Sequence, residues 1–522
     1  MPFSTITLKA HRLAYQFFAL SILSLFLTAC PATTVEIVDA AEEPVEFTIL
    51  QINDVYEIAP ISGGKVGGLA RVGGVLRQLE AENPNTIAVL AGDFLSPSFM
   101  GTLEMENDEP IAGLQMVETL NAMGLDYATF GNHEFDLKTG ELLEKRIDAS
   151  EFEYMSVNAQ FVGSDRSRRA FRQNGKDVPP YSLHTINQNG KSYELAIVGV
   201  VLPFNKKDYV DYRDVNTSFG TQVKMARAEA DIVIGLTHLS VDGDEELAKA
   251  VPGLPLFMGG HEHHQLSRYV GETAITKADA NAKTVYVHRL TYYPSTELCR
   301  VVSEIVPINE ETPEDEVTAA VVAKWQGKME ILVERMGYDL YEVLDTLDEK
   351  LIGTEVFVRS SQTNYGQLTN EAIATAWPGA DAYVFNSGSL RIDDDISGIV
   401  TTYDVLRSFP FGGPMVQLSM TGSQLQQMLD TGETTNQGEG GYLQRFQAEK
   451  QGGQWQINGQ ALVASNSYKV VMPSFLAGGG EANLGFLGDI TAKEERDDFS
   501  VGADTVKNDI RDIVIHYFKT RS

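Results

Sequence analysis

Six short segments of this chain carry side chains that bind metal ions, and most of them directly follow an apolar run that predicts a β-strand. A strand end is a rigid support, and the ends of neighbouring parallel strands meet at one edge of a sheet. The segments are 53–56, Gly92-Asp93, 131–134, Asp136, Thr237-His238 and 259–263. Their order and residue types predict a centre that holds two metal ions and carries out hydrolysis.

A hydrolytic two-metal centre needs a carboxylate that bridges the ions, further oxygen ligands and several imidazoles. Asp93 follows the apolar run 87–90 and suits the bridging position. Asp54 follows the run 47–52 and suits one of the two ions. The other candidate ligands supply an amide oxygen and three imidazoles: Asn132, His238, His261 and His263. A single His beside Gly is more often a plain loop residue, but four of the nine His in the chain fall in these segments, which favours metal binding.

His261 and His263 are separated by one residue, so both side chains reach one site only if the backbone turns. The double glycine Gly259-Gly260 stands directly before them, and glycine adopts turn conformations at little steric cost. These two glycines therefore permit such a turn.

His133 and Asp136 suggest a catalytic role rather than metal binding. An imidazole beside Asn132 can stabilise a transferring group or protonate its leaving oxygen. A carboxylate three residues later can orient that imidazole. The alternative is that both residues only shape the loop.

Length and charge narrow the classes of protein. The chain has 522 residues, enough for two domains, and 43% of them are hydrophobic, enough for buried cores. Its formal net charge of -31 argues against a nucleic-acid partner. A phosphate-binding segment of the type Gly-x4-Gly-Lys-Ser/Thr is absent from the sequence, so an ATPase of that class is not supported.

Residues 1–30 are typical of an export signal, with a basic start and an apolar run from 13 to 29. The ending Leu27-Thr28-Ala29-Cys30 resembles a bacterial lipobox, in which the cysteine becomes the lipidated first residue. An ordinary signal peptide that happens to contain Cys is the alternative. We expect a lipid anchor at Cys30, a linker over residues 31–45, and a location in the cell envelope on the periplasmic or extracellular face of a membrane.

Strand-like and helix-like segments alternate from about residue 47 to 307, which favours a layered domain that mixes helices and strands. An acidic break at 309–316 precedes an amphipathic segment at 317–336, which predicts a connecting helix. A second block of turns and apolar strands follows. The expected divisions are a catalytic domain over 46–308, a linker helix within 309–350 and a second domain over 351–522.

These motifs together resemble the calcineurin-like metallophosphoesterases, and within them the two-domain 5'-nucleotidase family that includes bacterial UDP-sugar hydrolases. The segment 131–136 matches the family pattern Gly-Asn-His-Glu-Phe-Asp in full. The resemblance implies an α+β fold: an N-terminal four-layer αββα sandwich, a linking helix and a C-terminal α/β substrate-binding domain. It also implies that Asp93 bridges two divalent ions. By the same resemblance, Asn132, His238 and His261 complete one metal site, and Asp54 and His263 belong to the other.

The sequence departs from this family at Tyr56, where the usual pattern Asp-x-His has its His. Tyr56 could bind metal as a phenolate, point away, or leave a water in that place. The ions could be Mn2+, Zn2+, Mg2+ or Ca2+. Loss of one neutral nitrogen ligand favours a harder, more oxygen-tolerant cation such as Mn2+ over Zn2+.

The second block also resembles the family, whose C-terminal domain stacks the nucleoside base between two Phe rings and holds the phosphate side with Arg. The resemblance assigns stacking to Phe411 and Phe475, each beside glycines, although most Phe are core residues. The other substrate-binding candidates by this resemblance are Asn386, Arg391, Glu481 and Arg359. Glu481 stands where the family often has Asp, a carboxylate that can bond the ribose hydroxyls.

The resulting expectation is an exported phosphohydrolase that removes phosphate from nucleotides by in-line attack of a metal-bound hydroxide. It would act as a 5'-nucleotidase without an obligate protein partner. Hydrolysis of UDP-sugars or of 2',3'-cyclic nucleotides is the close alternative, because a fold does not choose among substrates. A thiosulfohydrolase-like enzyme and a nucleotide-binding lipoprotein with an impaired metal site are the more distant ones.

Overall fold

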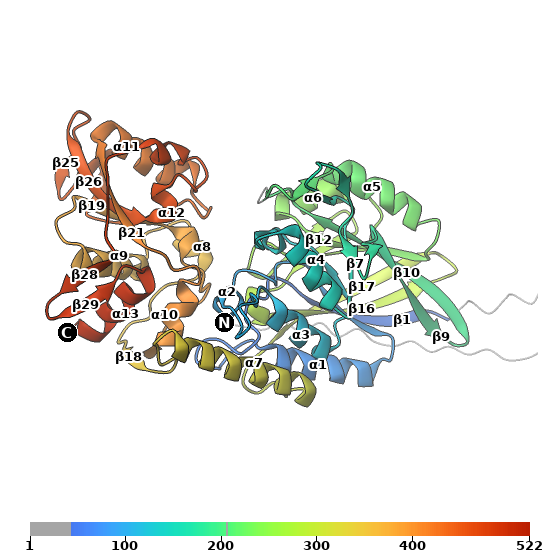
Figure 1. Cartoon of the computed structure of the whole chain (residues 1–522). Coiled ribbons are helices and arrows are strands. Elements are labelled where there is room, and N and C mark those ends of the chain that lie inside the picture. Colours follow the sequence, from blue (N-terminus) through green and yellow to red (C-terminus); the bar gives the residue numbers. More distant parts are fainter. Residues whose placement is uncertain (1–42, 205–206, 522) are drawn as a thin grey trace, which may run out of the picture. The chain divides into compact units, whose positions relative to one another are not determined.

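The computed structural model describes residues 43–204 and 207–521 (Figure 1). The predicted signal segment and its Cys30 lie outside these residues, as does most of the predicted linker. Among the helices of the described ranges, none combines the length and the apolar composition that crossing a membrane requires.

Two six-stranded sheets form the centre of the N-terminal part (Figure 1). In order across the first sheet, the strands are β17 (Leu298–Pro307), β16 (Thr284–Tyr293), β1 (Val45–Ile52), β2 (Thr86–Leu90), β3 (Tyr127–Thr129) and β4 (Glu153–Met155). In the second sheet they are β14 (Leu266–Val270), β15 (Thr273–Lys277), β13 (Leu256–Gly259), β12 (Ile232–His238), β10 (Lys191–Val201) and β9 (Tyr181–Gln188). The strands β1 to β4 pair in parallel, and so do β10, β12, β13 and β15.

Strand β1 shows why these segments become central strands. Its residues are nearly all buried, because both of its faces are covered. Phe47 and Ile49 belong to the core between the two sheets, whereas Leu50 and Ile52 belong to the core under the helices. This continuous apolar run is what a strand packed on both faces requires.

Helices cover the outer faces of both sheets. The cores that they share with the sheets contain residues of α1 (Leu69–Glu82), α3 (Leu114–Met123) and α4 (Gly140–Ala149) on one side, and of α5 (Val215–Ala226) and α6 (Val241–Ala250) on the other. The predicted four-layer αββα sandwich is confirmed.

The N-terminal part also contains smaller elements. They are α2 (Phe99–Thr102), η1 (His133–Asp136), η2 (Ala280–Ala282), β5 (Ala159–Val162), β6 (Arg168–Arg169), β7 (Arg172–Gln173), β8 (Lys176–Asp177) and β11 (Val210–Tyr212).

The predicted connecting helix is α7 (Glu316–Arg335), which begins after Asp315, whose side chain accepts a hydrogen bond from Thr318 N. It packs against α1 and α3 rather than crossing open solvent. Trp325 of α7 is fully buried, and its indole N–H donates to Glu118 Oε2 at 2.9 Å. The helix is therefore part of the N-terminal core.

The C-terminal part is built on a mixed five-stranded sheet with helices around it (Figure 1). Its strands in order are β22 (Leu443–Phe446), β19 (Ala382–Asn386), β26 (Ser467–Pro473), β21 (Met415–Thr421) and β27 (Lys493–Glu495). Its helices are α8 (Glu355–Val358), α9 (Asn364–Ala376), α10 (Thr402–Ser408), α11 (Gly422–Asp430), α12 (Ser474–Ala477) and α13 (Ile510–Thr520), with the turns η3 (Ser387–Ser389), η4 (Thr431–Thr435) and η5 (Gly485–Asp489). The small strands are β18 (Val343–Thr346), β20 (Ile399–Thr401), β23 (Ala448–Gln451), β24 (Gln454–Ile457), β25 (Gln460–Ala461), β28 (Asp498–Val501) and β29 (Asp504–Lys507).

A buried polar network joins the two sheets of the sandwich beneath the metal-binding segments. Gln51 of β1 donates to Gly259 O at 3.0 Å and to Thr276 O at 2.9 Å in the opposite sheet. Its Oε1 lies 2.9 Å from His288 Nε2, and His288 Nδ1 lies 2.8 Å from Ser303 Oγ. The buried side chains of Gln51 and His288 thus have partners for their polar atoms, as burial demands. The network fixes the position of β13 relative to β1.

Burial lowers the pKa of His288 to about 3, so its ring stays neutral in the fold, whereas the unfolded chain takes up a proton below about pH 6.5. His288 therefore contributes to the free energy of unfolding above pH 6.5, and this contribution is lost as the pH falls. At pH 5 the loss is about 2 kcal/mol. The variant His288→Gln cannot titrate, so its thermal unfolding midpoint in chelator should drop less between pH 7 and pH 5 than that of the wild type. Equal drops in the two proteins would contradict this account.

Candidate metal and substrate site

The candidate metal ligands gather at one edge of the sandwich. Asp54 follows β1, Asp93 follows β2, and His238 ends β12. Asn132 follows β3, and the 261–263 segment follows β13. These strands run parallel within their own sheets, so their carboxyl ends coincide. The fold thus brings together residues that are up to about two hundred positions apart in the sequence.

Asp54, Asp93 and His263 form the first group. One ligand atom from each lies within 4.8 Å of the other two, which is the spacing of a metal site. His263 Nε2 is 3.5 Å from Asp54 Oδ1. All three side chains are buried or nearly so, with His263 the most exposed at 9% of its side chain.

A second group shares Asp93 with the first. His238 Nε2 lies 3.2 Å from Asp93 Oδ2 and 3.2 Å from Asn132 Oδ1, so three ligand types surround one point. His238 Nδ1 lies 2.7 Å from Ala91 O, which leaves Nε2 facing the site. The ring of His261 stands edge-on to that of His238, with centroids 5.5 Å apart. Asp93 therefore lies between the two groups of candidate ligands.

The ligand segments adopt a backbone conformation that non-glycine residues rarely take. Asp54, Asp93, His261 and His263 have φ values of 52°, 58°, 92° and 58°. Each such residue carries a steric cost, and residues of this kind concentrate at functional sites because the surrounding structure enforces them. The left-handed turns aim these four side chains at one place.

The backbone does turn after Gly259-Gly260, and the left-handed residues of this turn are the two histidines themselves. Gly260 is needed for close approach instead. A Cβ there would lie 2.5 Å from Ala91 O and 2.9 Å from Asp54 Oδ2. Gly131 is equally tight, because a Cβ would lie 2.1 Å from Asp93 Oδ1.

The residues present fit divalent cations. Asp54 Oδ1 is fully buried and has no hydrogen-bond partner among the described residues. An isolated buried carboxylate oxygen is costly unless it is paired or binds a metal. The donor set of carboxylate, amide oxygen and imidazole is the one that Mn2+ and Zn2+ accept. These side chains could therefore hold two ions.

Tyr56 points into this site, so the alternative in which it points away is excluded. Its hydroxyl lies 3.0 Å from His263 Nε2 and 3.3 Å from Asp93 Oδ2. Burial, together with Asp93 and Asp54, raises the pKa of Tyr56 well above its usual value. The hydroxyl of Tyr56 thus faces the first group of ligands.

Without ions, the site compensates its charges internally. Burial opposes the charged form of His238, but the neighbouring Asp93 raises its pKa to about 10. Burial likewise opposes the charge on His263, but Glu355, Asp393 and Asp54 raise its pKa to about 9. Metal binding has to displace such protons, because only neutral imidazole binds a metal.

His133 and Asp136 form the predicted dyad. His133 Nδ1 lies 2.6 Å from Asp136 Oδ2, and the His133 backbone N–H donates to Asp93 Oδ1 at 2.7 Å. The other ring nitrogen, Nε2, lies 3.1 Å from Arg391 Nη2, which comes from the C-terminal part of the chain. A polar group from each part of the chain therefore faces this imidazole.

The other C-terminal candidates fall into two places. Arg359 Nη2 binds Glu355 Oε2 at 2.6 Å, and Arg391 Nη1 lies 3.8 Å from that same oxygen. Glu355 was not among the sequence candidates. Asn386 donates to Glu481 Oε2 at 2.8 Å, so the carboxylate predicted for ribose binding is already engaged by a neighbouring amide.

Phe411 and Phe475 lie at the same end of two paired strands. Met415 of β21 pairs with Pro473 of β26, so the loop before β21 and the turn after β26 are neighbours. Phe411 and Phe475 are 55% and 54% exposed as residues, so the alternative that they are core residues does not hold for either of them. Two exposed rings on adjoining segments are available for a planar ligand.

Glu134 has a structural role in this site. It belongs to the 131–136 motif, but the sequence alone did not indicate a role for it. It is fully buried, and its carboxylate accepts hydrogen bonds from the backbone N–H groups of Asp93, Phe94 and Leu95 at 2.9, 2.8 and 3.1 Å. It also accepts from Gly131 N. One side chain therefore ties the loop after β2 to the loop after β3.

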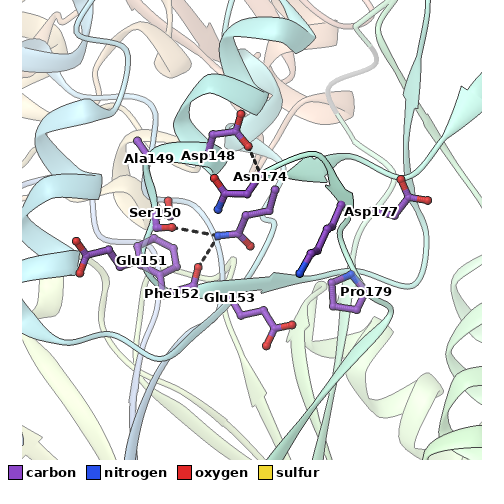
Figure 2. A pocket seen from close by; sticks show the side chains of 11 residues that line it. Asp148, Ala149, Ser150, Glu151, Phe152, Glu153, Asn174, Asp177 and Pro179 are labelled. Carbon is purple, nitrogen blue, oxygen red and sulfur yellow. Dashed lines mark hydrogen bonds between the residues drawn. The ribbon is translucent and has the colours of Figure 1, made fainter.

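A separate pocket of about 820 Å³ opens beside α4 and β4 and contains none of the candidate site residues (Figure 2). Its carboxylates come from Asp148, Glu151, Glu153 and Asp177. Gln173 in this pocket already donates to Ser150 O and Phe152 O. The candidate site residues at the strand ends therefore lie outside this pocket.

Two family models match this chain. A calcineurin-like phosphoesterase model matches residues 47–265, and a 5'-nucleotidase C-terminal domain model matches residues 344–486. The chain is thus a metal-dependent phosphoester hydrolase of the calcineurin-like class. It belongs to the 5'-nucleotidase family, in which this catalytic domain is followed by that C-terminal domain.

Individual relatives agree with this assignment. A snake venom 5'-nucleotidase from Naja atra is 24% identical over 88% of this chain and 96% of its own length. Among solved structures, a 5'-nucleotidase precursor from Thermus thermophilus has a TM-score of 0.73 at 20% identity, over 91% of this chain and 96% of that one. A sulfate thiohydrolase SoxB, also from Thermus thermophilus, has a TM-score of 0.63 at 16% identity, over 91% and 94%. The fold is therefore shared by proteins whose names state different substrates.

Replacing Glu134 by Gln tests whether its hydrogen bonds hold together the loop after β2 and the loop after β3. The amide offers one acceptor oxygen in place of two and turns an N–H₂ group toward backbone N–H donors. We expect a loss of about 2–4 kcal/mol in stability and weaker metal binding, because buried donors lose their partners. Thermal unfolding and calorimetric Mn2+ titration would measure both. The exposed Glu141→Gln on α4 is the control, and a Glu134→Gln protein that behaves like it would refute the role.

Proposed function

We propose that this chain removes the 5'-phosphate from nucleotides. The observation that carries the proposal is the contact between Arg391 of the C-terminal part and His133 of the N-terminal part, at 3.1 Å. The two stacking candidates belong to the same part as Arg391, and the metal ligands to the same part as His133. A nucleotide could therefore place its base at one end of the site and its phosphate at the other.

Each residue then has a role that follows from its position. The ions, held by Asp54, Asp93, Asn132, His238, His261 and His263, would activate a water and neutralise charge on the phosphate. His133, oriented by Asp136, would protonate or hydrogen-bond the leaving oxygen through Nε2. Arg391 would hold the phosphate oxygens, with Arg359 as the second cation nearby. Phe411 and Phe475 would stack on the two faces of the base.

The substrate class remains part of the proposal. Sugar nucleotides and 2',3'-cyclic nucleotides carry the same base and phosphate, so they stay as the close alternative. A thiosulfohydrolase-like activity is less favoured, because two exposed Phe rings fit a base better than a small sulfur substrate. A nucleotide-binding lipoprotein without activity is less favoured, because the His133–Asp136 pair and both ligand groups are assembled.

Location and metal identity are further parts of it. The segment 1–30 supports export with a lipid anchor at Cys30, on the periplasmic or extracellular face of a membrane. No obligate protein partner and no nucleic acid is proposed. Tyr56 places a phenol oxygen where the family has a nitrogen ligand, which supports Mn2+ rather than Zn2+ as the working ion of the first group.

Phosphate release from AMP by the chelator-stripped chain tests the reaction. Activity should be absent without metal, return most fully with Mn2+, and return less with Zn2+, Mg2+ or Ca2+ given singly. His133→Ala should lower kcat by about 100- to 10,000-fold, the range of a lost general acid. Zn2+ alone supporting full activity would refute the metal preference. No release with any ion would refute the 5'-nucleotidase assignment and point to the alternative substrates.

The stacking role predicts a change in KM. Replacing Phe411 or Phe475 by Ala should raise KM for AMP by about 5- to 150-fold, the equivalent of 1–3 kcal/mol per stacked face. Hydrolysis of glycerol phosphate, which has no base, should be unchanged. Tyr269→Ala removes an exposed ring elsewhere, on β14, and serves as the control. If both Phe variants kept the wild-type KM for AMP, the rings would have no part in binding.

A further inference from the structure

We propose that Asp393, from the C-terminal part of the chain, is a positioning residue for the candidate metal ligand His263. The observation is that Asp393 Oδ2 lies 3.2 Å from His263 Nδ1. The inference deepens the proposed function, on which it rests, because it makes the metal site of the N-terminal part depend on a residue from the nucleotide-binding part. It concerns metal affinity, which can be measured apart from catalysis.

The two ring nitrogens of His263 face different groups. Nε2 faces the metal site, 3.0 Å from Tyr56 Oη and 3.5 Å from Asp54 Oδ1. Nδ1 faces Asp393, with Glu355 Oε1 somewhat farther away at 3.5 Å. A carboxylate that accepts the Nδ1 proton fixes the tautomer and the ring orientation, and leaves Nε2 free to bind metal. Asp393 is placed to do this.

Asp393 is itself held rigidly. It is 5% exposed, and its φ of 44° is one that Asp and Asn tolerate better than most residues. Its Oδ1 accepts the backbone N–H of Glu355 at 2.8 Å, which directs Oδ2 toward His263. Oδ1 is thus hydrogen-bonded, and Oδ2 lies within ion-pair distance of His263 Nδ1 without a hydrogen bond among the described residues.

A second set of contacts joins the same two residues through the backbone. Ala280 N donates to His263 O at 3.0 Å, and three residues later Lys283 Nζ donates to Asp393 O at 2.9 Å. Asp393 and His263 are thus linked by their side chains and by the 280–283 turn. An ion pair between two exposed surface residues would lack these additional backbone hydrogen bonds.

The neighbouring residue, Asp394, also joins the two parts of the chain, but its contacts among the described residues do not involve a candidate metal ligand. Asp394 accepts from Ser62 Oγ at 2.9 and 2.7 Å, and Arg407 Nη2 lies 3.2 Å from its Oδ2. This carboxylate joins the same two parts and carries the same charge, but no candidate metal ligand is among the partners recorded for it in the described residues. It is therefore the matched control for Asp393.

Metal binding and docking of the 391–395 segment should then stabilise each other, because coupling between two sites is reciprocal. An orienting carboxylate of this kind typically accounts for about 10- to 100-fold in metal affinity. The C-terminal part would accordingly complete the metal centre as well as bind the nucleotide.

The test is calorimetric titration of Mn2+ into the chelator-stripped full chain. Asp393→Asn keeps the size and tolerates the left-handed backbone, but it removes the negative charge that lies 3.2 Å from His263 Nδ1. We expect one of the bound ions to lose about 10- to 100-fold in affinity in this variant. The adjacent Asp394→Asn should leave the Mn2+ affinity unchanged.

Three outcomes would overturn the proposal: Asp393→Asn binding Mn2+ like the wild type, Asp394→Asn losing as much affinity as Asp393→Asn, or a wild-type chain that binds no Mn2+. If Asp393→Asn does not fold, the variant Lys283→Met serves instead. It removes the hydrogen bond to Asp393 O and should lower the Mn2+ affinity severalfold.

Failure of the proposed function is seen separately. A wild type that releases no phosphate from any nucleotide, while the variants differ in Mn2+ affinity as stated, would remove the substrate assignment and leave the positioning role.

Discussion

The structure depends on one constraint: a group of charged and polar ligands is buried at an edge where the strands of two sheets end. Asp54, Asp93 and His238 are essentially inaccessible to water. Burying such groups is costly unless they are paired with one another or with cations. The paired arrangement of Asp93 with His238 supplies part of the compensation, and divalent ions would supply the rest. The surrounding elements serve to hold this group in place.

The surrounding chain fixes that group in three ways. Glu134 ties two ligand loops together through their backbone N–H groups. The Gln51–His288 network fixes the two sheets against each other directly under the site. Strained left-handed residues then aim the ligands, and the hydrogen bonds around them hold that strain. The candidate metal ligands are therefore held at the ends of strands in fixed backbone conformations.

The sequence was sufficient for the parts that follow from local pattern. Apolar runs followed by Asp54, Asp93 or His238 predicted strands with ligands at their ends, and the sandwich confirms those strands. The double glycine Gly259-Gly260 indicated that the backbone can turn here, but it could not show which residues turn. Gly260 allows close approach, and His261 takes the left-handed conformation.

What the sequence could not give are contacts between distant residues. Asp393 meets His263 across 130 positions, and neither belongs to a pattern that names the other. The direction of Tyr56 could not be derived either, because a phenol beside a metal site can point in or out. Glu134 was visible in its motif, but its four N–H partners come from two loops that only the fold brings together.

The central claim is that the ligand groups at this edge hold two ions on which nucleotide hydrolysis depends. The most direct test is to titrate Mn2+ into the chelator-stripped chain while counting bound ions and measuring phosphate release from AMP. The account predicts that activity is absent at zero occupancy and is complete only when two ions are bound per chain. Full activity in the stripped protein, or activity that saturates before the second ion binds, would contradict it.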